Sequence, residues 1–416
     1  MNKVFTLSLS ILVLLTSCGK ASLVADSLPP SATNPPLATI YIPPTQTTIP
    51  IPSTVTFTPT LLPLIPDITA TANPSGLQFA VIPEQITLQN ATFNSLDAYE
   101  FLLLRKASAV NMTWSVIGNE HIAATISDGV VTAIPLDPAW HGSETIQVQA
   151  CESPGACATQ TILYSIMDKD AYSDVQVTFV GNAGFLITAG DKKVLIDAFF
   201  TGFPPGYMLP FNVKSLLLNA KPPFDQIDLI LATHDHADHF SAEMVRQSMQ
   251  NNPNAIFIST TQAVSHLADF GNRVIAMDPV TGTPVNAEAN GIQVEAIYLS
   301  HGTPPSGSTE IYNNGYVVTI NEIKFFHTGD IAALRDVVQY NLSDQNIDLA
   351  FIMHFYLQNS ASRSILDINI GAKHLFPIHY QYTTPDYNRE VVLFNYPDAV
   401  VFNLELESWI MPRIDE

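Results

Sequence analysis

The chain has 416 residues, which is enough for two or three domains with a buried core. Its formal net charge of -21, from 38 acidic and 17 basic side chains, would repel a phosphate backbone and excludes a simple nucleic-acid-binding protein. Hydrophobic residues make up 47% of the sequence and charged residues only 13%, a low share of charge for a soluble protein.

Residues 1–18 have the features of an export signal. Lys3 supplies a positive charge, and residues 4–15 form an apolar run that is short for a membrane span but suits the hydrophobic part of a signal peptide. The run ends in Leu15-Thr16-Ser17-Cys18, which resembles the lipobox of bacterial lipoproteins. This resemblance implies cleavage before Cys18 and lipid attachment to its thiol, which would anchor the mature protein to a membrane outside the cytoplasm. An ordinary secretory signal is the alternative.

Residues 19–77 are rich in proline and threonine and carry few charges. Because proline lacks an amide N–H and restricts φ, neither a helix nor a strand ladder is expected there. We expect an extended tether, partly in the polyproline-II conformation, that holds the folded parts away from the membrane.

Residues 78–168 predict a small all-β sandwich. Short β-rich runs, such as 145–148 and 160–166, alternate with Gly, Asn, Asp and Pro turn signals. The stretch 138–142, followed by a strand, resembles the late-strand pattern of bacterial immunoglobulin-like repeats. Cys151 and Cys157 bracket a short loop, and they could form a local disulfide in an oxidising compartment or remain free thiols.

From residue 174 onward, strand-like and helix-like runs alternate, which predicts an α/β domain over 174–416. Runs 175–180, 184–188 and 193–197 predict three successive strands. Run 227–233 is apolar, as in a strand buried on both faces, and a helix is expected over 241–250. Further strands are expected at 255–259, 274–277, 292–299, 315–320, 322–326, 349–353 and 374–378. Polar residues gather at the strand ends, where sites usually form.

The strongest chemical signal follows the apolar strand, in Thr233-His234-Asp235-His236-Ala237-Asp238-His239. His234 and His236 stand two apart, so they project to the same side of an extended segment. Once the chain turns towards the helix, Asp238 and His239 can face a neighbouring position. Imidazole nitrogens with carboxylate oxygens are the ligands expected for Zn and are acceptable for Mn or Fe. One loop could therefore serve two adjacent divalent cations.

This motif is similar to the His-x-His-x-Asp-His signature of the metallo-β-lactamase superfamily, and the similarity extends over residues 174–416. The stretch 179–185 followed by 194–197 looks like the first two motifs of that family. The resemblance implies an αββα sandwich, in which the Asp197 carboxylate supports the ligands without binding metal. Asn182 stands where many relatives have histidine, and it is a candidate for lining the substrate cleft.

The remaining ligands are expected from later strand ends. His301 follows the predicted strand 292–299 and is favoured as the third histidine over His266, which lies in a predicted helix at 261–270. By resemblance, Asp330 in His327-Thr328-Gly329-Asp330 is the bridging carboxylate, and His379 in the stretch 377–380 is the closing histidine.

The assembled prediction is a two-metal centre. His234, His236 and His301 would bind one cation, Asp238, His239 and His379 the other, and Asp330 would lie between them. Cations ~3.5–4 Å apart would share a hydroxide as nucleophile, and Asp238 is the expected acceptor of its proton. Of the other histidines, His327 is expected behind the ligands, and His354, at a strand end, is a candidate for lining the cleft.

The stretch 315–330 and the closing motif are most similar to the branch that contains L-ascorbate-6-phosphate lactonase and N-acylphosphatidylethanolamine phospholipase D. This resemblance implies a hydrolase that cleaves an ester, lactone or phosphodiester of a small-molecule or lipid-like substrate at the cell surface. No cysteine follows Cys157, whereas antibiotic-hydrolysing relatives often use one as a ligand. Segments 199–223 and 302–314 are expected to cover the site, with Phe199, Phe200, Phe203, Tyr207 and Phe211 as an apolar wall or as packing. The alternative function is a surface-displayed binding or assembly module with an idle metal domain.

Overall fold

The computed structural model describes residues 77–103, 112–152, 156–202, 207–302, 310–380 and 385–413. The expected signal segment 1–18, its lipidation site Cys18 and the tether up to residue 76 lie outside these residues. Among the residues described, no helix is long and apolar enough to cross a bilayer.

The N-terminal part of the described chain is β-rich and contains two sheets, with strand orders β1-β7-β6-β3 and β2-β5-β4. Their strands are β1 (Gln85–Leu88), β2 (Leu96–Asp97), β3 (Met112–Ile117), β4 (Ile122–Ser127), β5 (Val130–Pro135), β6 (Gly142–Glu152) and β7 (Ala156–Met167). Burial alternates along β5 and β6, and the inward residues Val131, Ile146 and Ile162 belong to one core. The region is β-rich as expected, and its immunoglobulin-like character stays a prediction. Cys151 and Cys157 face each other across β6 and β7 and are joined by a disulfide.

Two larger sheets follow. The first has seven strands in the order β13-β12-β11-β10-β9-β8-β20, and the second has six in the order β14-β15-β16-β17-β18-β19. Strands of the first are β8 (Tyr172–Gly181), β9 (Gly184–Ala189), β10 (Lys192–Ile196), β11 (Leu229–Leu231), β12 (Ile256–Ser259), β13 (Val274–Ala276) and β20 (Ser408–Pro412). Strands of the second are β14 (Val285–Ala289), β15 (Ile292–Tyr298), β16 (Asn314–Ile320), β17 (Ile323–His327), β18 (Leu349–Met353) and β19 (His374–Ile378).

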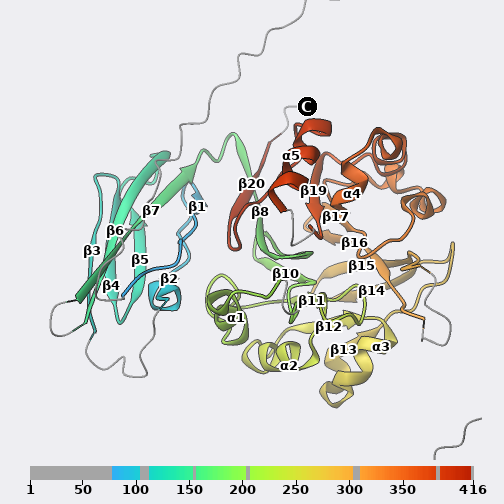
Figure 1. Ribbon diagram of the computed structural model, residues 1–416, viewed down its shortest axis with the longest axis horizontal. Helices are drawn as coiled ribbons and strands as arrows, with labels where there is room; N and C mark the ends of the chain where they lie inside the picture. The colour runs from blue at the N-terminus through green and yellow to red at the C-terminus, as the bar shows by residue number, and fades with distance from the viewer. Residues whose placement is uncertain are drawn as a thin grey trace, which may run out of the picture. The chain divides into compact units, whose positions relative to one another are not determined.

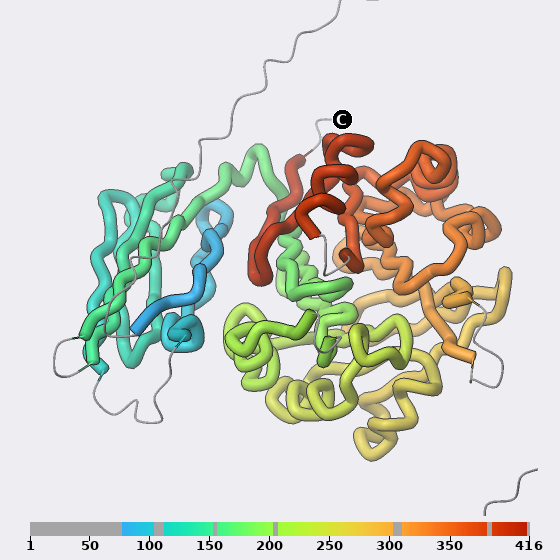
Figure 2. The backbone as a smooth tube through the Cα atoms, viewed as in Figure 1, coloured from blue at the N-terminus to red at the C-terminus, as the bar shows by residue number. Residues whose placement is uncertain are grey.

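Both sheets combine antiparallel and parallel pairs. Strands β8, β9 and β10 form antiparallel hairpins, and β10 to β13 then run parallel. In the other sheet β14 to β17 are antiparallel, and β17, β18 and β19 are parallel. The last strand, β20, returns to pair with β8, and Figure 2 shows this red segment alongside the green one. Strand β20 is therefore the edge strand of this sheet, next to β8, the first strand of the sheet along the chain.

The two sheets pack face to face, because inward residues of both belong to one core. Val194 and Ile196 of β10 lie in the same core as Val318 and Phe351 of the other sheet, whereas Leu195 points to the opposite face. On that outer face Leu195 shares a second core with residues of the helices α1 (Phe211–Leu218) and α2 (Ala242–Asn251). The result is an α/β sandwich with helices outside two packed sheets, as expected (Figure 1).

Further helices surround the site. The short α3 (Thr261–Val264) is followed by a 3-10 segment over Ser265–Arg273, α4 (His354–Leu357) follows β18, and α5 (Pro385–Asn395) packs against α4. Strands β14 and β20 and helices α1 and α5 were not predicted from the sequence. Phe199 and Phe200, which were predicted either to line the cleft or to pack, belong to the buried core and are packing residues. Phe211 is 68% exposed. Phe203 lies outside the described residues.

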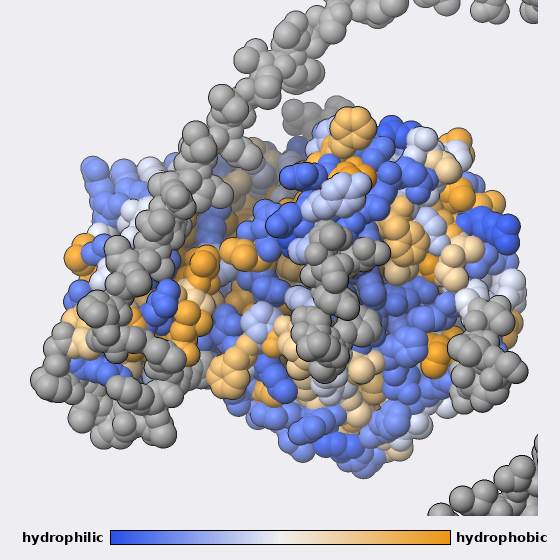
Figure 3. All heavy atoms as spheres, in the orientation of Figure 1, coloured by the Kyte–Doolittle hydropathy of each residue, from blue (hydrophilic) through white to orange (hydrophobic). Residues whose placement is uncertain are grey.

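On the face shown in Figure 3, hydrophilic side chains predominate over the two-sheet domain, and hydrophobic ones are scattered among them. The most exposed large hydrophobic residues include Phe394, Phe211 and Ile368. Scattered exposed apolar side chains of this kind are normal for a folded domain.

Candidate metal centre

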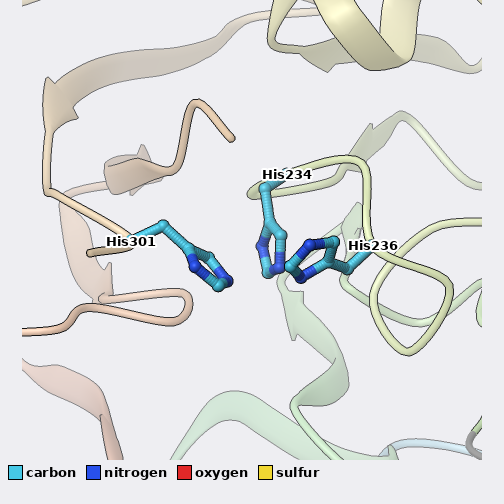
Figure 4. Close-up of side chains that lie close together, drawn as sticks. All are labelled: His234, His236 and His301. Carbon is cyan, nitrogen blue, oxygen red and sulfur yellow. The ribbon is translucent and has the colours of Figure 1, made fainter. Parts of the chain in front are cut away.

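Two groups of candidate ligands converge where strands of the two sheets end. The ligand atoms of His234, His236 and His301 all lie within 4.8 Å of one another, and we call these residues the first set. Figure 4 shows their three imidazole rings pointing towards one another, with His301 coming from a different segment than the other two. His301 follows β15, and the other two follow β11.

The second set consists of Asp238, His239, Asp330 and His379, whose ligand atoms also lie within 4.8 Å of one another. Asp330 reaches both sets: one oxygen is 3.1 Å from His239 Nε2, and the other is 3.4 Å from His379 Nε2 and 3.8 Å from His301 Nε2. The structure thus brings all seven predicted ligands together in the predicted grouping. Whether they bind metal stays a prediction.

The loop after β11 places four of these residues through local backbone geometry. The amides of His239 and Phe240 both donate to the carbonyl of His236, at 3.0 and 2.8 Å, which closes a tight turn. The Ser241 hydroxyl then caps α2 by accepting from the Met244 amide. The turn reverses the chain between His236 and Asp238, so one short loop contributes to both sets.

The donor atoms fit a bound cation. His234 Nε2, His239 Nε2, His301 Nε2 and Asp330 Oδ1 are buried and have no hydrogen-bond partner. A buried polar atom left without a partner costs about 1–3 kcal/mol, so four such atoms facing one another form an arrangement that needs a common partner. Imidazole nitrogens and carboxylate oxygens without thiolates suit Zn, Mn or Fe. The residues therefore match the divalent cations expected from the sequence.

The pKa values of the ligand side chains shift in different directions, depending on burial and on the charges next to each side chain. Burial lowers the pKa of His234 well below its ordinary value and also lowers that of His301, which keeps both rings neutral and able to offer a lone pair. Burial opposes ionisation of Asp330, but the imidazoles of His239, His379 and His234 outweigh it and hold its pKa below the usual range. For His239 burial acts downwards, yet the carboxylates of Asp330 and Asp197 raise its pKa well above normal. The second set is thus the more negative one and the better site for positive charge.

Asp197 supports the second set from behind. It is fully buried and accepts hydrogen bonds from the Thr233 amide (2.7 Å), the Thr233 hydroxyl (2.8 Å) and His239 Nδ1 (2.8 Å). With its Nδ1 proton held by Asp197, the His239 ring directs Nε2 towards the other ligands, and Nε2 must lose its own proton before it can bind a cation. A carboxylate behind a histidine in this way fixes the tautomer and strengthens a ligand.

His327 and Asn182 also hold the ligand loops. The His327 ring is fully buried, donates from Nε2 to the Ala183 carbonyl (3.0 Å) and accepts the Gly329 amide at Nδ1 (3.0 Å). Asn182 donates to the Asp238 carbonyl (2.9 Å), and its own carbonyl accepts the His379 amide (3.1 Å). His327 therefore lies behind the ligands as expected, while Asn182 connects two ligand segments.

The backbone at the centre is held in unfavourable conformations. Asn182, Asp197 and His379 have positive φ values of 53°, 46° and 59°. Non-glycine residues in this region cost about 1–3 kcal/mol each and cluster at functional sites. Gly329 also has a positive φ, and a Cβ there would collide with Asn313 and Thr233. Glycine is thus required immediately before Asp330.

Two other predicted histidines lie apart from the sets. His266 is 52% exposed at its side chain, and its Nε2 is 3.5 Å from Asp235 Oδ2, so His301 completes the first set instead. His354 is buried, its ring is 5.5 Å from that of Tyr380, and its Nδ1 has no hydrogen-bond partner. It lies beside the segment that carries His379.

Sequence reasoning missed Asn313, which joins two ligand-bearing loops. Its side-chain amide donates to the carbonyls of Leu299 and Thr328, each at 3.1 Å, and accepts the Asp330 amide at 3.1 Å. The available signal was the polar pair Asn313-Asn314 directly before an apolar strand. This pair resembled an ordinary turn.

The chain is similar in sequence to a known protein family and to several metal-dependent hydrolases. Residues 176–379 match the family model described as beta-lactamase superfamily domain. A metal-dependent hydrolase of Thermococcus onnurineus is 27% identical over 221 residues, which are 51% of this chain and 87% of the relative. One of Pelotomaculum thermopropionicum is 30% identical over 168 residues, 39% of this chain and 65% of the relative.

Solved structures to which the chain is similar include a metallo hydrolase of Ignicoccus hospitalis, with a TM-score of 0.41 and 16% identity, covering 58% of this chain and 99% of that one. A metallo-beta-lactamase fold protein of Bacillus subtilis has a TM-score of 0.40 and 15% identity, covering 57% and 98%.

Proposed function

We propose that this protein is a metal-dependent hydrolase of the metallo-β-lactamase superfamily, whose family model matches residues 176–379, and that it uses two divalent cations to hydrolyse an ester, lactone or phosphodiester bond. The observation that carries the proposal is the convergence of two ligand sets that share Asp330, with buried nitrogens that have no hydrogen-bond partner. The first set would hold one cation and the second set the other. Zn suits the donor set best, and Mn or Fe are acceptable.

When bound, a pair of divalent cations lowers the pKa of a water molecule and polarises a carbonyl or phosphoryl oxygen. The chain's residues supply the remaining parts. The Asp330 carboxylate lies between the two sets, within 4 Å of His301 in the first set and of His239 and His379 in the second. Asp238 is kept ionised by the imidazoles of His239 and His379, which outweigh its burial, so its carboxylate can accept the proton of the attacking water. Asp197 and His327 hold the ligand loops against rotation.

The class of bond cleaved is inferred from resemblance and charge. The stretch 315–330 and the closing Pro377-Ile378-His379-Tyr380 are most similar to the branch with lactonase and phospholipase D activities, which supports a small-molecule or lipid-like substrate. The net charge of -21 argues against a nucleic-acid substrate. We further propose that the protein acts outside the cytoplasm, anchored through lipidated Cys18, because of the lipobox-like segment at the end of its signal.

Metal content and turnover test the proposal together. Protein stripped with a chelator and reloaded with Zn or Mn is expected to bind two equivalents and to hydrolyse p-nitrophenyl acetate, a lactone or bis(p-nitrophenyl) phosphate. His301→Ala should lose one equivalent and nearly all turnover. His266→Ala is the matched control, because His266 lies in the same domain outside both sets, and it should behave as wild type. A folded protein that takes up no metal and turns over none of these substrates would favour the binding-module alternative.

A further inference from the structure

A cavity of about 200 Å³ lies next to the metal centre, and we call it the side cavity. Its lining includes Asn182, Tyr207, Tyr380, Arg389 and Glu405. Two of these residues connect it directly to the second set. Asn182 is hydrogen-bonded to the Asp238 carbonyl, and Tyr380 follows His379 in the chain. These contacts place the side cavity beside the second set.

The lining combines aromatic faces with both donors and acceptors. Tyr207 donates to Glu405 at 2.7 Å, and burial together with the Glu405 carboxylate raises its pKa, so it stays a donor. The Arg389 guanidinium lies 5.1 Å from the centre of the Tyr380 ring. The terminal nitrogens of Arg389 donate to Asp386 and to the Asn403 carbonyl, whereas its Nε and the Tyr380 hydroxyl are buried without a hydrogen-bond partner. Among the lining residues that the structure describes, Arg389 is the one cation and Glu405 the one anion.

We propose that the side cavity binds a neutral, hydroxyl-bearing ring of the substrate, a proposal that rests on the hydrolase function above. The C–H face of such a ring packs on a tyrosine, while its hydroxyls can donate to Glu405 and accept from Arg389 and Tyr380. A plain alkyl chain would leave the buried polar groups without partners, which costs about 1–3 kcal/mol for each group. An anion would meet Glu405 as well as Arg389, so it gains little net attraction.

Binding of simple probes tests this assignment without requiring turnover. Saturation-transfer NMR with the full protein should detect methyl β-D-glucopyranoside, and neither cyclohexanol nor inorganic phosphate should compete with it. Arg389→Gln and Glu405→Gln should each weaken binding of the glucoside at least tenfold. The matched control is Arg363→Gln, because the Arg363 guanidinium lies 4.8 Å from the Tyr396 ring centre outside the cavity lining. That variant should bind as wild type.

Three results would overturn the assignment: no glucoside signal, tighter binding of cyclohexanol or phosphate, or equal binding by all three variants. These outcomes are separable from failure of the hydrolase proposal, because a protein that hydrolyses generic esters can still fail to bind the glucoside. Conversely, a protein without turnover can still bind the glucoside in this cavity.

Asn313 supports a second inference, from separate contacts. Its side chain is fully buried and joins the Leu299 carbonyl, two residues before His301, to the Thr328 carbonyl and the Asp330 amide. It also occupies the space that a side chain at position 329 would need. We infer that Asn313 is a positioning residue that keeps His301 and Asp330 at the spacing needed to serve both sets. No other described side chain hydrogen-bonds to both loops.

The neighbouring Asn314 provides a matched control. It is equally buried, and its amide donates to the Met277 carbonyl (2.8 Å) and the Tyr316 hydroxyl (3.1 Å), neither of which belongs to a ligand loop. Asn313→Ala removes three buried hydrogen bonds and Asn314→Ala removes two. They should lower the melting temperature of the metal-free protein to a similar extent.

The two variants should differ in metal binding. Asn313→Ala is expected to bind Co(II), followed by its visible absorption, 10–100-fold more weakly, as is usual when a group behind a ligand is lost. Asn314→Ala should bind as wild type. If Asn313→Ala does not fold, Asn313→Asp replaces it, since it keeps the shape and loses both donated hydrogen bonds. Wild-type binding by the Asn313 variant, or equal losses in both, would reduce Asn313 to a structural residue even if hydrolysis is established. A wild-type protein that binds no metal overturns both proposals.

Discussion

Replacement of Asp197 by asparagine should weaken the second ligand set much more than the first. Asp197 Oδ2 accepts from both the Thr233 hydroxyl and His239 Nδ1. An asparagine that keeps an oxygen at the Oδ1 position, to accept the Thr233 amide at 2.7 Å, must turn its NH2 group towards these two atoms. The threonine hydroxyl can rotate and accept. His239 must then give up its Nδ1 proton and carry one on Nε2, the atom that faces the cations.

The size of the effect follows from these contacts. A hydrogen bond to a charged acceptor contributes about 1.5–3 kcal/mol, and at about 1.4 kcal/mol per tenfold this is a 10–100-fold loss in affinity for the second cation. That range agrees with the usual effect of removing a carboxylate behind a histidine ligand. Affinity for the first cation should fall less, because Asp197 makes no hydrogen bond to His236 or His301 and reaches His234 only through the Thr233 hydroxyl, which lies 3.0 Å from His234 Nδ1.

Stepwise titration of the stripped protein with Zn against a competing chelator measures the two affinities separately. Asp348→Asn is the matched control, since Asp348 is a buried aspartate of the same domain that accepts the Lys324 amide and pairs with Lys373, remote from both sets. Two equivalents bound by Asp197→Asn with wild-type affinity would refute the tautomer argument. Equal losses in the control would show that general destabilisation is the cause.

Three further results are expected. Gly329→Ala should lower the free energy of unfolding by more than 2 kcal/mol in urea titrations, because it adds a clash with Asn313 and Thr233 to the strain of about 1–2 kcal/mol. Gly371→Ala, with a φ of 62° in the left-handed region and only ordinary contacts around the added Cβ, should show the strain alone, and equal losses would contradict the packing argument. In the metal-free protein the raised pKa of His239 stabilises the fold below about pH 6.5, and this contribution should fall as pH rises through the raised value. Metal affinity should rise over the same pH range, because the proton that competes with the cation for His239 dissociates. Melting curves and Zn titrations between pH 6 and 9 test this. Melting temperatures and Zn affinities that do not change with pH would contradict the raised pKa of His239. Phe351→Ala should cost about 3–5 kcal/mol, since its fully buried ring packs between Phe185 and Phe376, whereas Phe211→Ala, at an exposed position, should cost under 1 kcal/mol in the same measurement.

Some elements were predictable because their causes are local. The apolar run before His234 predicts a buried strand from composition alone, and β11 lies inside that run. The helix expected at 241–250 corresponds to α2, whose first turn is fixed by the Ser241 cap. The grouping of His234 with His236, and of Asp238 with His239, also depends on a few consecutive residues. A short window of sequence contains all that these features need.

Other elements depend on partners that are remote in sequence. Strand β20 pairs with β8, more than 200 residues earlier, and nothing within its own five residues indicates that pairing. From their local sequence, Phe199 and Phe200 could either line a cleft or pack in the core. The structure places both in a core shared with α1 and α2, so they are packing residues. For short apolar runs, burial is a property of the surroundings and is only partly encoded locally.

The amino-acid sequence by itself determined the ligand types, their division into a contiguous loop and three later strand ends, and the α/β alternation that places strand ends together. Only the tertiary structure decided that His301 and not His266 completes the first set, that Asp330 reaches both sets, and that Asn313 joins their loops. The physical reason is that the identity of a single residue determines whether it can bind a metal, and a short stretch of sequence determines the hydrophobic periodicity of a helix or strand. Distances of 3–4 Å between side chains from separate strands arise instead from the packing of two whole sheets, which no local pattern specifies.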